Sequence, residues 1–144
     1  MLLQRRPRQR GFALFDALIS MAILCFGLLA MTRFQTRMVA QTTEAQSRQV
    51  ATQLAAEHLS TVLVDAGNAA CYTVPFSGTC GNTVAKANTA SWAARVSSSL
   101  PGTVSSTVGL DGTTGLMTLV ISWTGKSTGD TRTLRTVTDV RFPS

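Results

Sequence analysis

The sequence predicts an α+β protein in which a long N-terminal helix, membrane-spanning in its first half, packs on a small C-terminal antiparallel sheet. Residues 12–31 form an apolar run with a single charge, Asp16, and are long enough to cross a bilayer as a helix. Residues 12–65 contain no proline, which favours one continuous helix. After residue 100, apolar and polar side chains alternate in short segments, as they do in half-buried strands.

The apolar run follows a basic segment. Four arginines and no acidic residue precede it, namely Arg5, Arg6, Arg8 and Arg10. These arginines are expected to remain in the cytoplasm, which places everything after Met31 on the other side of the membrane. A secretory signal peptide would have a shorter apolar stretch and a small-residue cleavage site at its end. We therefore expect a retained single-pass segment, and its simplest interpretation is an ordinary membrane anchor.

Asp16 is the feature that an ordinary anchor does not explain. An aspartate deep in an apolar segment costs about 2.5–3.5 kcal/mol on insertion scales, and the next basic residue, Arg33, is 17 positions away. A partner from another chain, or one created by processing, would offset that cost. Cleavage after Gly11 would give Phe12 a free α-amine, which could neutralise Asp16 of a neighbouring copy. The pattern therefore predicts ordered polymerisation from a membrane pool.

The stretch RQRGFALFDALISMAILCFGLLAM resembles the class III leader and N-terminal helix of type IV prepilins and type II secretion pseudopilins. The resemblance implies that Gly11 is the last leader residue and that prepilin peptidase cuts after it. It also implies that the same enzyme methylates Phe12 and that Asp16 replaces the glutamate usual at the fifth mature position. Aspartate keeps the charge but shortens the reach by one methylene. Residues 1–11 would then be a cleaved basic leader, and residues 12–31 the transmembrane half of the long helix.

Most of the excess positive charge lies in this leader. Four of the thirteen basic residues lie there, so the mature chain would carry nine basic and seven acidic side chains. The remaining cations are scattered along the sequence, and no dense basic run remains. The leader arginines orient the chain in the membrane and do not form a DNA-binding surface. The sequence pI of about 10.3 is therefore weak support for nucleic-acid binding.

Two of the three cysteines lie outside the apolar run. Cys71 and Cys80 are nine positions apart, and an oxidising compartment favours a disulfide between them. Two unpaired thiols remain the alternative. Cys25 lies inside the apolar run and is expected to pack as a small hydrophobe. A zinc site is disfavoured because His58 is the only histidine.

Residues 32–67 are predicted to be the amphipathic half of the long helix. Apolar residues recur there at spacings near three and four or their multiples, and Gly67-Asn68 provides a stop signal. We expect this half to pack on the exported domain, residues 68–144. The apolar positions are Phe34, Met38, Val50, Leu54, Leu59 and Val62.

The exported domain is predicted to contain a cysteine loop, a short helix and an antiparallel sheet. The helix covers residues 88–100, with Trp92 and Val96 on one face, and ends before Pro101-Gly102. Strands are expected at 103–108, 116–124 and 131–142, with a hairpin at Asp111-Gly112. In the second strand, Met117, Leu119, Ile121 and Trp123 alternate with Leu116, Thr118, Val120 and Ser122. In the third, Leu134, Val140 and Phe142 are expected to share one face.

No residue pattern in the sequence predicts catalysis, a metal site or a cofactor. His58 has no nucleophile at a useful spacing, and we expect it to be a partly exposed helix residue. Trp92 and Trp123 are interpreted as core aromatics, although either could stack on a ligand base. The arginines of the last strand are interpreted as solvated charges that protect an edge strand from unwanted pairing. These are Arg132, Arg135 and Arg141.

Within the family, the chain is most similar to PilV-type minor pilins. The stretch ILCFGLLAMTRFQT resembles the run that follows their anchor motif, and the order of Trp92, Val96, Leu100-Pro101-Gly102 and Trp123 is also similar. This resemblance implies a structural subunit that helps to prime or modify pilus assembly with the major pilin and other minor pilins. It implies the bacterial inner membrane before assembly, with a cytoplasmic N-terminus, and the periplasm or pilus fibre afterwards. The alternatives are a minor pseudopilin of a type II secretion system and a DNA-binding minor pilin acting in DNA uptake.

Overall fold

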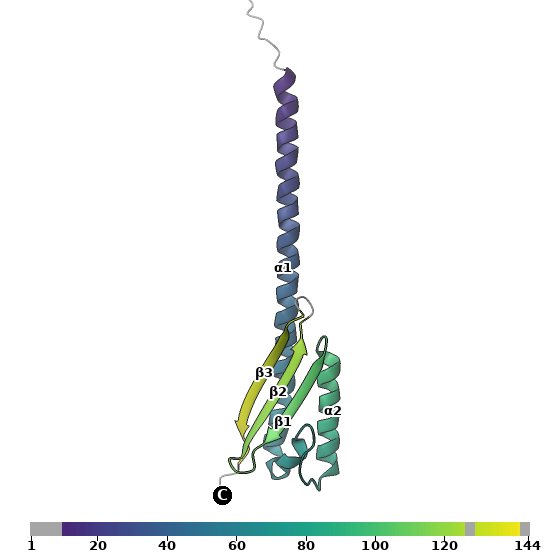
Figure 1. The fold of residues 1–144 in the computed structure, drawn as a ribbon, viewed down its shortest axis with the longest axis vertical. Coiled ribbons are helices and arrows are strands. Elements are labelled where there is room, and N and C mark those ends of the chain that lie inside the picture. The colour runs from purple at the N-terminus through teal and green to yellow at the C-terminus, as the bar shows by residue number, and fades with distance from the viewer. Residues whose placement is uncertain (1–9, 126–128, 142–144) are drawn as a thin grey trace, which may run out of the picture. The chain divides into compact units, whose positions relative to one another are not determined.

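The computed structural model describes residues 10–125 and 129–141, with the side chains of residues 10 and 11 excepted. The chain forms two compact units, Met1–Gln41 and Thr42–Ser144, and one long helix contributes to both (Figure 1). A small three-stranded antiparallel sheet completes the α+β layout that the sequence predicts. The elements are α1 (Arg10–Val64), the 3-10 segment η1 (Ala66–Tyr72), α2 (Thr83–Ser99), β1 (Val104–Leu110), β2 (Leu116–Thr124) and β3 (Thr131–Asp139).

In the first unit, α1 presents apolar side chains all around its circumference. Residues 12–39 are all exposed, and the most apolar stretch of the helix has a mean hydropathy of 2.3. Among the described residues, α1 is the one helix long and apolar enough to cross a membrane. A helix that is hydrophobic on every side is stable only in an apolar environment. The first unit is therefore compatible with a membrane anchor.

In the second unit, α1 buries a single stripe. The stripe consists of residues that recur at spacings of three and four, as expected for one helix face. It begins later than the sequence predicts, because Phe34 and Met38 lie in the first unit with exposed fractions of 65% and 49%. The buried positions are Ala51, Leu54, Ala55, His58, Leu59 and Val62.

The end of α1 differs from the prediction of a glycine stop. The helix ends at Val64, and Gly67 and Asn68 lie inside η1, neither with a positive φ. Asp65 supports the tighter turn in two ways: its carbonyl accepts the Asn68 N–H at 2.9 Å, and its carboxylate accepts the Asn68 side-chain amide at 2.8 Å. The Asp65 interactions thus replace the expected left-handed glycine cap.

β2 is the central strand of the sheet, and it pairs antiparallel with β1 on one side and β3 on the other. Its bounds are those that the alternation predicts, because every second side chain is buried. Met117, Leu119, Ile121 and Trp123 are at most 2% exposed. β1 extends two residues beyond the predicted end, to Leu110, and β3 ends at Asp139. Phe142, expected on the same face of the last strand as Leu134 and Val140, lies outside the described residues.

The turn between β1 and β2 confirms the predicted hairpin at Asp111-Gly112. The Asp111 carboxylate accepts hydrogen bonds from the backbone N–H of Thr113 at 2.9 Å and from the hydroxyl of Thr114 at 2.7 Å. The chain then returns through Gly115, whose φ of +71° falls in the region that glycine favours. Asp111 therefore closes the turn with its side chain, as aspartate commonly does in such positions.

Helix α2 begins five residues earlier than predicted. Asn82 caps it, because its side-chain oxygen accepts hydrogen bonds from the backbone N–H groups of Val84 and Ala85, both at 3.1 Å. The predicted apolar face is confirmed, since Trp92 and Val96 are buried. Trp92 also donates its indole N–H to the carbonyl of Leu54 at 2.8 Å, so α2 is tied directly to the stripe of α1.

Candidate functional site

The predicted processing site lies at the start of α1. Gly11 and Phe12 have helical backbone, and the Phe12 side chain is 78% exposed. Asp16 is exposed one turn further along, on the same side of the helix as Phe12 because residues four apart share a face. Asp16 has no hydrogen bond or ion pair to any described residue of the chain.

The predicted disulfide between Cys71 and Cys80 is confirmed. It joins the buried end of η1 to the segment just before the Asn82 cap of α2. The Thr89 hydroxyl lies 3.3 Å from the Cys71 carbonyl, so α2 contacts the bridged segment as well. Cys25 is a free, exposed thiol in the apolar part of α1.

Replacing both bridged cysteines with serine is expected to lower the free energy of unfolding of the second unit by about 2–3 kcal/mol, because the loop closure no longer restricts the unfolded chain. The measurement is chemical denaturation of the full chain in micelles, followed by tryptophan fluorescence, since both tryptophans lie in the second unit. Cys25→Ser is the control and should change stability by less than about 0.5 kcal/mol. Equal stability of the double variant and the parent would contradict this prediction.

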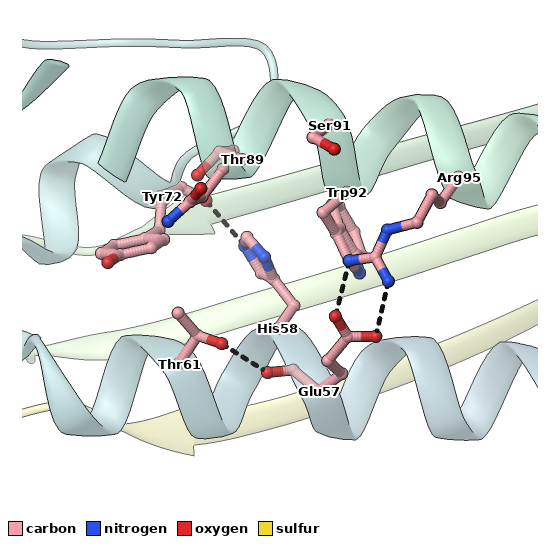
Figure 2. A pocket seen from close by; sticks show the side chains of 9 residues that line it. Glu57, His58, Thr61, Tyr72, Thr89, Ser91, Trp92 and Arg95 are labelled. Carbon is pink, nitrogen blue, oxygen red and sulfur yellow. Dashed lines mark hydrogen bonds and ion pairs between the residues drawn. The ribbon is translucent and has the colours of Figure 1, made fainter. Parts of the chain in front are cut away.

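A pocket of about 250 Å³ lies in the second unit where α1, η1 and α2 meet. Figure 2 shows its walls: the helix α1 side carries Glu57, His58 and Thr61, and the α2 side carries Thr89, Ser91, Trp92 and Arg95. Tyr72 contributes from η1. Asn88 of α2 completes the set of nine residues that line the pocket.

His58 is the most buried polar group of this pocket. It is 3% exposed, its ring stacks on Trp92 at 4.1 Å, and it meets Tyr72 edge-on at 5.9 Å. Its Nε2 lies 3.0 Å from the Tyr72 carbonyl oxygen. Because a carbonyl can only accept, Nε2 carries the proton and the lone pair of the neutral ring is on Nδ1.

The expectation that His58 is partly exposed is wrong. The spacing of the buried stripe of α1 includes position 58, three residues after Ala55 and four before Val62. The polar side chain led to the wrong expectation, although the helical period alone places His58 on the buried face. Burial was possible because the Tyr72 carbonyl satisfies one ring nitrogen.

The titratable groups of the pocket carry no net charge near neutral pH. Burial lowers the pKa of His58, although the Tyr72 carbonyl and Glu57 act in the opposite direction. Burial and the nearby Asp65 carboxylate, which accepts the phenolic hydrogen bond, raise the pKa of Tyr72 to about 12. The two hydrogen bonds from Arg95, at 3.1 and 2.5 Å, lower the pKa of Glu57. The pocket thus contains a neutral imidazole, a neutral phenol and a closed ion pair.

Acidification is expected to destabilise the second unit through His58. The unfolded chain takes up a proton near the ordinary histidine pKa of about 6.5, whereas the native pKa is lower. His58 therefore contributes stability that is complete above pH 6.5 and is lost as the pH falls from there through the native pKa. The measurement is the free energy of unfolding of the full chain between pH 7.5 and 5, with the imidazole pKa read by NMR.

The control for this titration is His58→Gln, which keeps an amide N–H for the Tyr72 carbonyl but does not titrate. Its stability is expected to vary much less over the same pH range. His58 is the only histidine, so the imidazole signals need no assignment. A native pKa at or above 6.5 would contradict the prediction.

The arginines of the C-terminal segment occupy different environments. Arg135 is exposed on the edge strand β3, and Arg141 is exposed and pairs with Asp139 at 2.6 Å. Hydrogen bonds from Arg141 lower the pKa of Asp139 to about 2. The expectation of a solvated charge is wrong for Arg132, whose Nε lies 2.9 Å from the Glu44 carboxylate of α1. Arg132 shares a strand face with Leu134, and alternate residues point to the same side.

The two candidate sites lie in different units of the chain. The first consists of Gly11, Phe12 and Asp16 on α1, and the second is the His58 pocket. No group of three or more histidine, cysteine, aspartate or glutamate residues among the described residues is arranged to hold a metal ion. The chain matches no protein-family model, no curated protein and no solved structure.

Proposed function

We propose that the chain is a minor type IV pilin, a structural subunit that helps to prime or modify a pilus fibre. The observation that carries the proposal is the start of α1. Residues 12–31 are apolar and exposed with Asp16 as their only charge, and they follow directly on Gly11 and an arginine-rich segment. The disulfide-bonded second unit supports the proposal, because disulfides persist in oxidising compartments such as the periplasm.

The proposed mechanism begins with the subunit stored in the inner membrane. Prepilin peptidase cuts after Gly11 and methylates the new amine of Phe12. That amine, still positively charged, pairs with Asp16 of the next subunit when the apolar helices stack. The pairing offsets the cost of an aspartate in an apolar environment and favours one register of the stack. The major pilin and other minor pilins are the expected neighbours.

The ion pairs of the second unit support a structural subunit over a DNA-binding one. Arg48, Arg95, Arg132 and Arg141 all pair with carboxylates of the same chain. Paired arginines contribute little to the positive field that attracts a phosphate backbone. If the chain bound DNA with an affinity that falls as the salt concentration rises, the function in DNA uptake would be favoured instead.

The test of the proposal is to express the full chain with and without prepilin peptidase and to measure intact and N-terminal peptide masses. We expect loss of residues 1–11 and the addition of one methyl group to Phe12. If the chain remains uncut while the peptidase cuts a control prepilin, the proposal is wrong and the protein is an ordinary membrane anchor. Co-purification of the processed chain with pilus fibres, and not with a secretion complex, then separates the minor pilin from the pseudopilin.

A further inference from the structure

We propose that the His58 pocket binds one uncharged sugar ring, either as a free monosaccharide or as the terminal unit of a glycan. The pocket lies wholly in the second unit, so this inference goes beyond the assembly function and does not depend on processing or on Asp16. It rests on the charge of the pocket, its unused hydrogen-bonding groups and its size.

The charge of the pocket favours a neutral ligand. Each Glu57 carboxylate oxygen accepts a hydrogen bond from Arg95, so the charges of both side chains are satisfied within the protein. Figure 2 shows this pair closing one side of the pocket between the two helices. His58 remains uncharged because its pKa is lowered by burial. A charged ligand would find no free opposite charge to offset the loss of its hydration.

Three polar groups of the pocket have hydrogen-bonding capacity that the described part of the chain leaves unused. The side chains of Asn88 and Ser91, both on α2, make no hydrogen bond to other described residues. The third group is Nδ1 of His58, which is an acceptor because Nε2 donates to Tyr72. His58 is 97% buried, so a ligand hydroxyl that donates to Nδ1 must enter the pocket.

Together these groups offer donors and acceptors of the kind that adjacent sugar hydroxyls require. Asn88 provides both an N–H donor and a carbonyl acceptor, Ser91 provides either, and His58 provides an acceptor. Each hydroxyl of a sugar likewise donates once and accepts. A polyhydroxylated ring therefore satisfies a mixed set of this kind better than a ligand with one polar group.

The size of the pocket favours a small ring. Its volume of about 250 Å³ lies below the range of about 300–1,000 Å³ typical of sites for drug-sized ligands. Tyr72 and Trp92 line the pocket but are only 3% and 2% exposed, so a ligand would be held by its polar groups and not by stacking on these rings. A nucleobase is disfavoured because one face of Trp92 is already stacked against His58, and base recognition relies on open aromatic faces.

The test is an NMR titration of the full, uncut chain, in nanodiscs or in a zwitterionic detergent that contains no sugar headgroup. The ¹⁵N signals of the single histidine report directly on Nδ1, provided that the affinity tag contains no histidine. The probes are glucose, galactose, mannose and N-acetylglucosamine, with glucuronate and glucosamine as charged comparisons. We expect a saturable shift of the Nδ1 signal with at least one neutral sugar and weaker effects with the charged ones.

Asn88→Ala and Ser91→Ala are the decisive variants, because neither side chain makes a hydrogen bond within the part of the chain that the structure describes. Each is expected to weaken sugar binding by about fivefold to tenfold, the effect of losing one hydrogen bond. Ser97→Ala, on the same helix but outside the pocket, is the matched control and should bind like the parent. Unfolding curves show whether each variant keeps the parent stability.

Three results would overturn the proposal: no saturable shift with any neutral sugar, tighter binding of a charged sugar, or unchanged binding by both decisive variants. The methyl glycoside of the sugar that binds distinguishes the two sources. Equal affinity for the glycoside places the ring at the end of a glycan, and loss of binding identifies the free sugar. Because the uncut chain is used, failure of the processing test leaves this result unaffected.

Discussion

An Asp16→Asn chain is expected to be cut and methylated normally but to be absent from sheared pilus fibres. Asparagine keeps the shape of the side chain and removes its charge, so the amine of the next Phe12 would enter the apolar stack unpaired. Removing one partner of a buried ion pair costs about 3–5 kcal/mol, which corresponds to a loss of more than about a hundredfold in incorporation. The measurement is the ratio of fibre-bound to membrane-bound subunit by quantitative blotting.

Two further variants give this experiment its controls. Asp16→Glu restores the missing methylene and should incorporate at least as well as the parent chain. Ser20→Asn introduces a polar amide four residues later on the same helix face without changing any charge, and it should still enter fibres. If Asp16→Asn also entered fibres at the parent level, the carboxylate would have no part in assembly.

A Gly11→Leu chain is expected to remain full length in the presence of active prepilin peptidase. Glycine has no side chain, and we expect a branched side chain next to the cut to prevent the peptide bond from entering the active site. Without cleavage, Phe12 has no free amine, so this chain should also be missing from fibres. Intact mass spectrometry checks the first outcome, and blotting of sheared fibres checks the second.

Gly27→Leu is the matched control, because it makes the same replacement elsewhere in α1. A side chain added at Gly27 would meet no atom within 4 Å, so the helix should accept it and processing should be normal. Cleavage of the Gly11→Leu chain at the parent position would show that the glycine is not required. Cleavage of the Gly11→Leu chain at another position would show that the mature protein begins at a residue other than Phe12.

The central strand and the hairpin before it were predictable because their signals are local. Alternation of apolar and polar residues gave the bounds of β2, and the Asp111-Gly112 pair gave the hairpin. The start of α2 was missed because Asn82 acts as a cap only through its own side-chain hydrogen bonds, and the residues after it have no strong apolar period. Local chemistry that depends on one side chain is easily overlooked in a sequence.

The pocket could not be predicted because its residues come together only in the folded second unit. His58 and Tyr72 are 14 positions apart, and Glu57 and Arg95 are 38 apart. The helical period indicated that position 58 is buried, but nothing in the sequence showed which carbonyl would accept its proton. The same reason explains Arg132, whose partner Glu44 lies on a different element. The roles of Gly11, Phe12 and Asp16 remain predictions.

The order of the strands has a consequence for how the second unit folds. Since β1, β2 and β3 pair with their neighbours in sequence, the sheet needs only short loops to close, and low contact order favours rapid folding. The contact between Trp92 and Leu54 instead spans 38 positions, with a larger entropic cost of closure. We expect the sheet to form early and docking of α2 on α1 to limit the rate at which the second unit reaches its native structure.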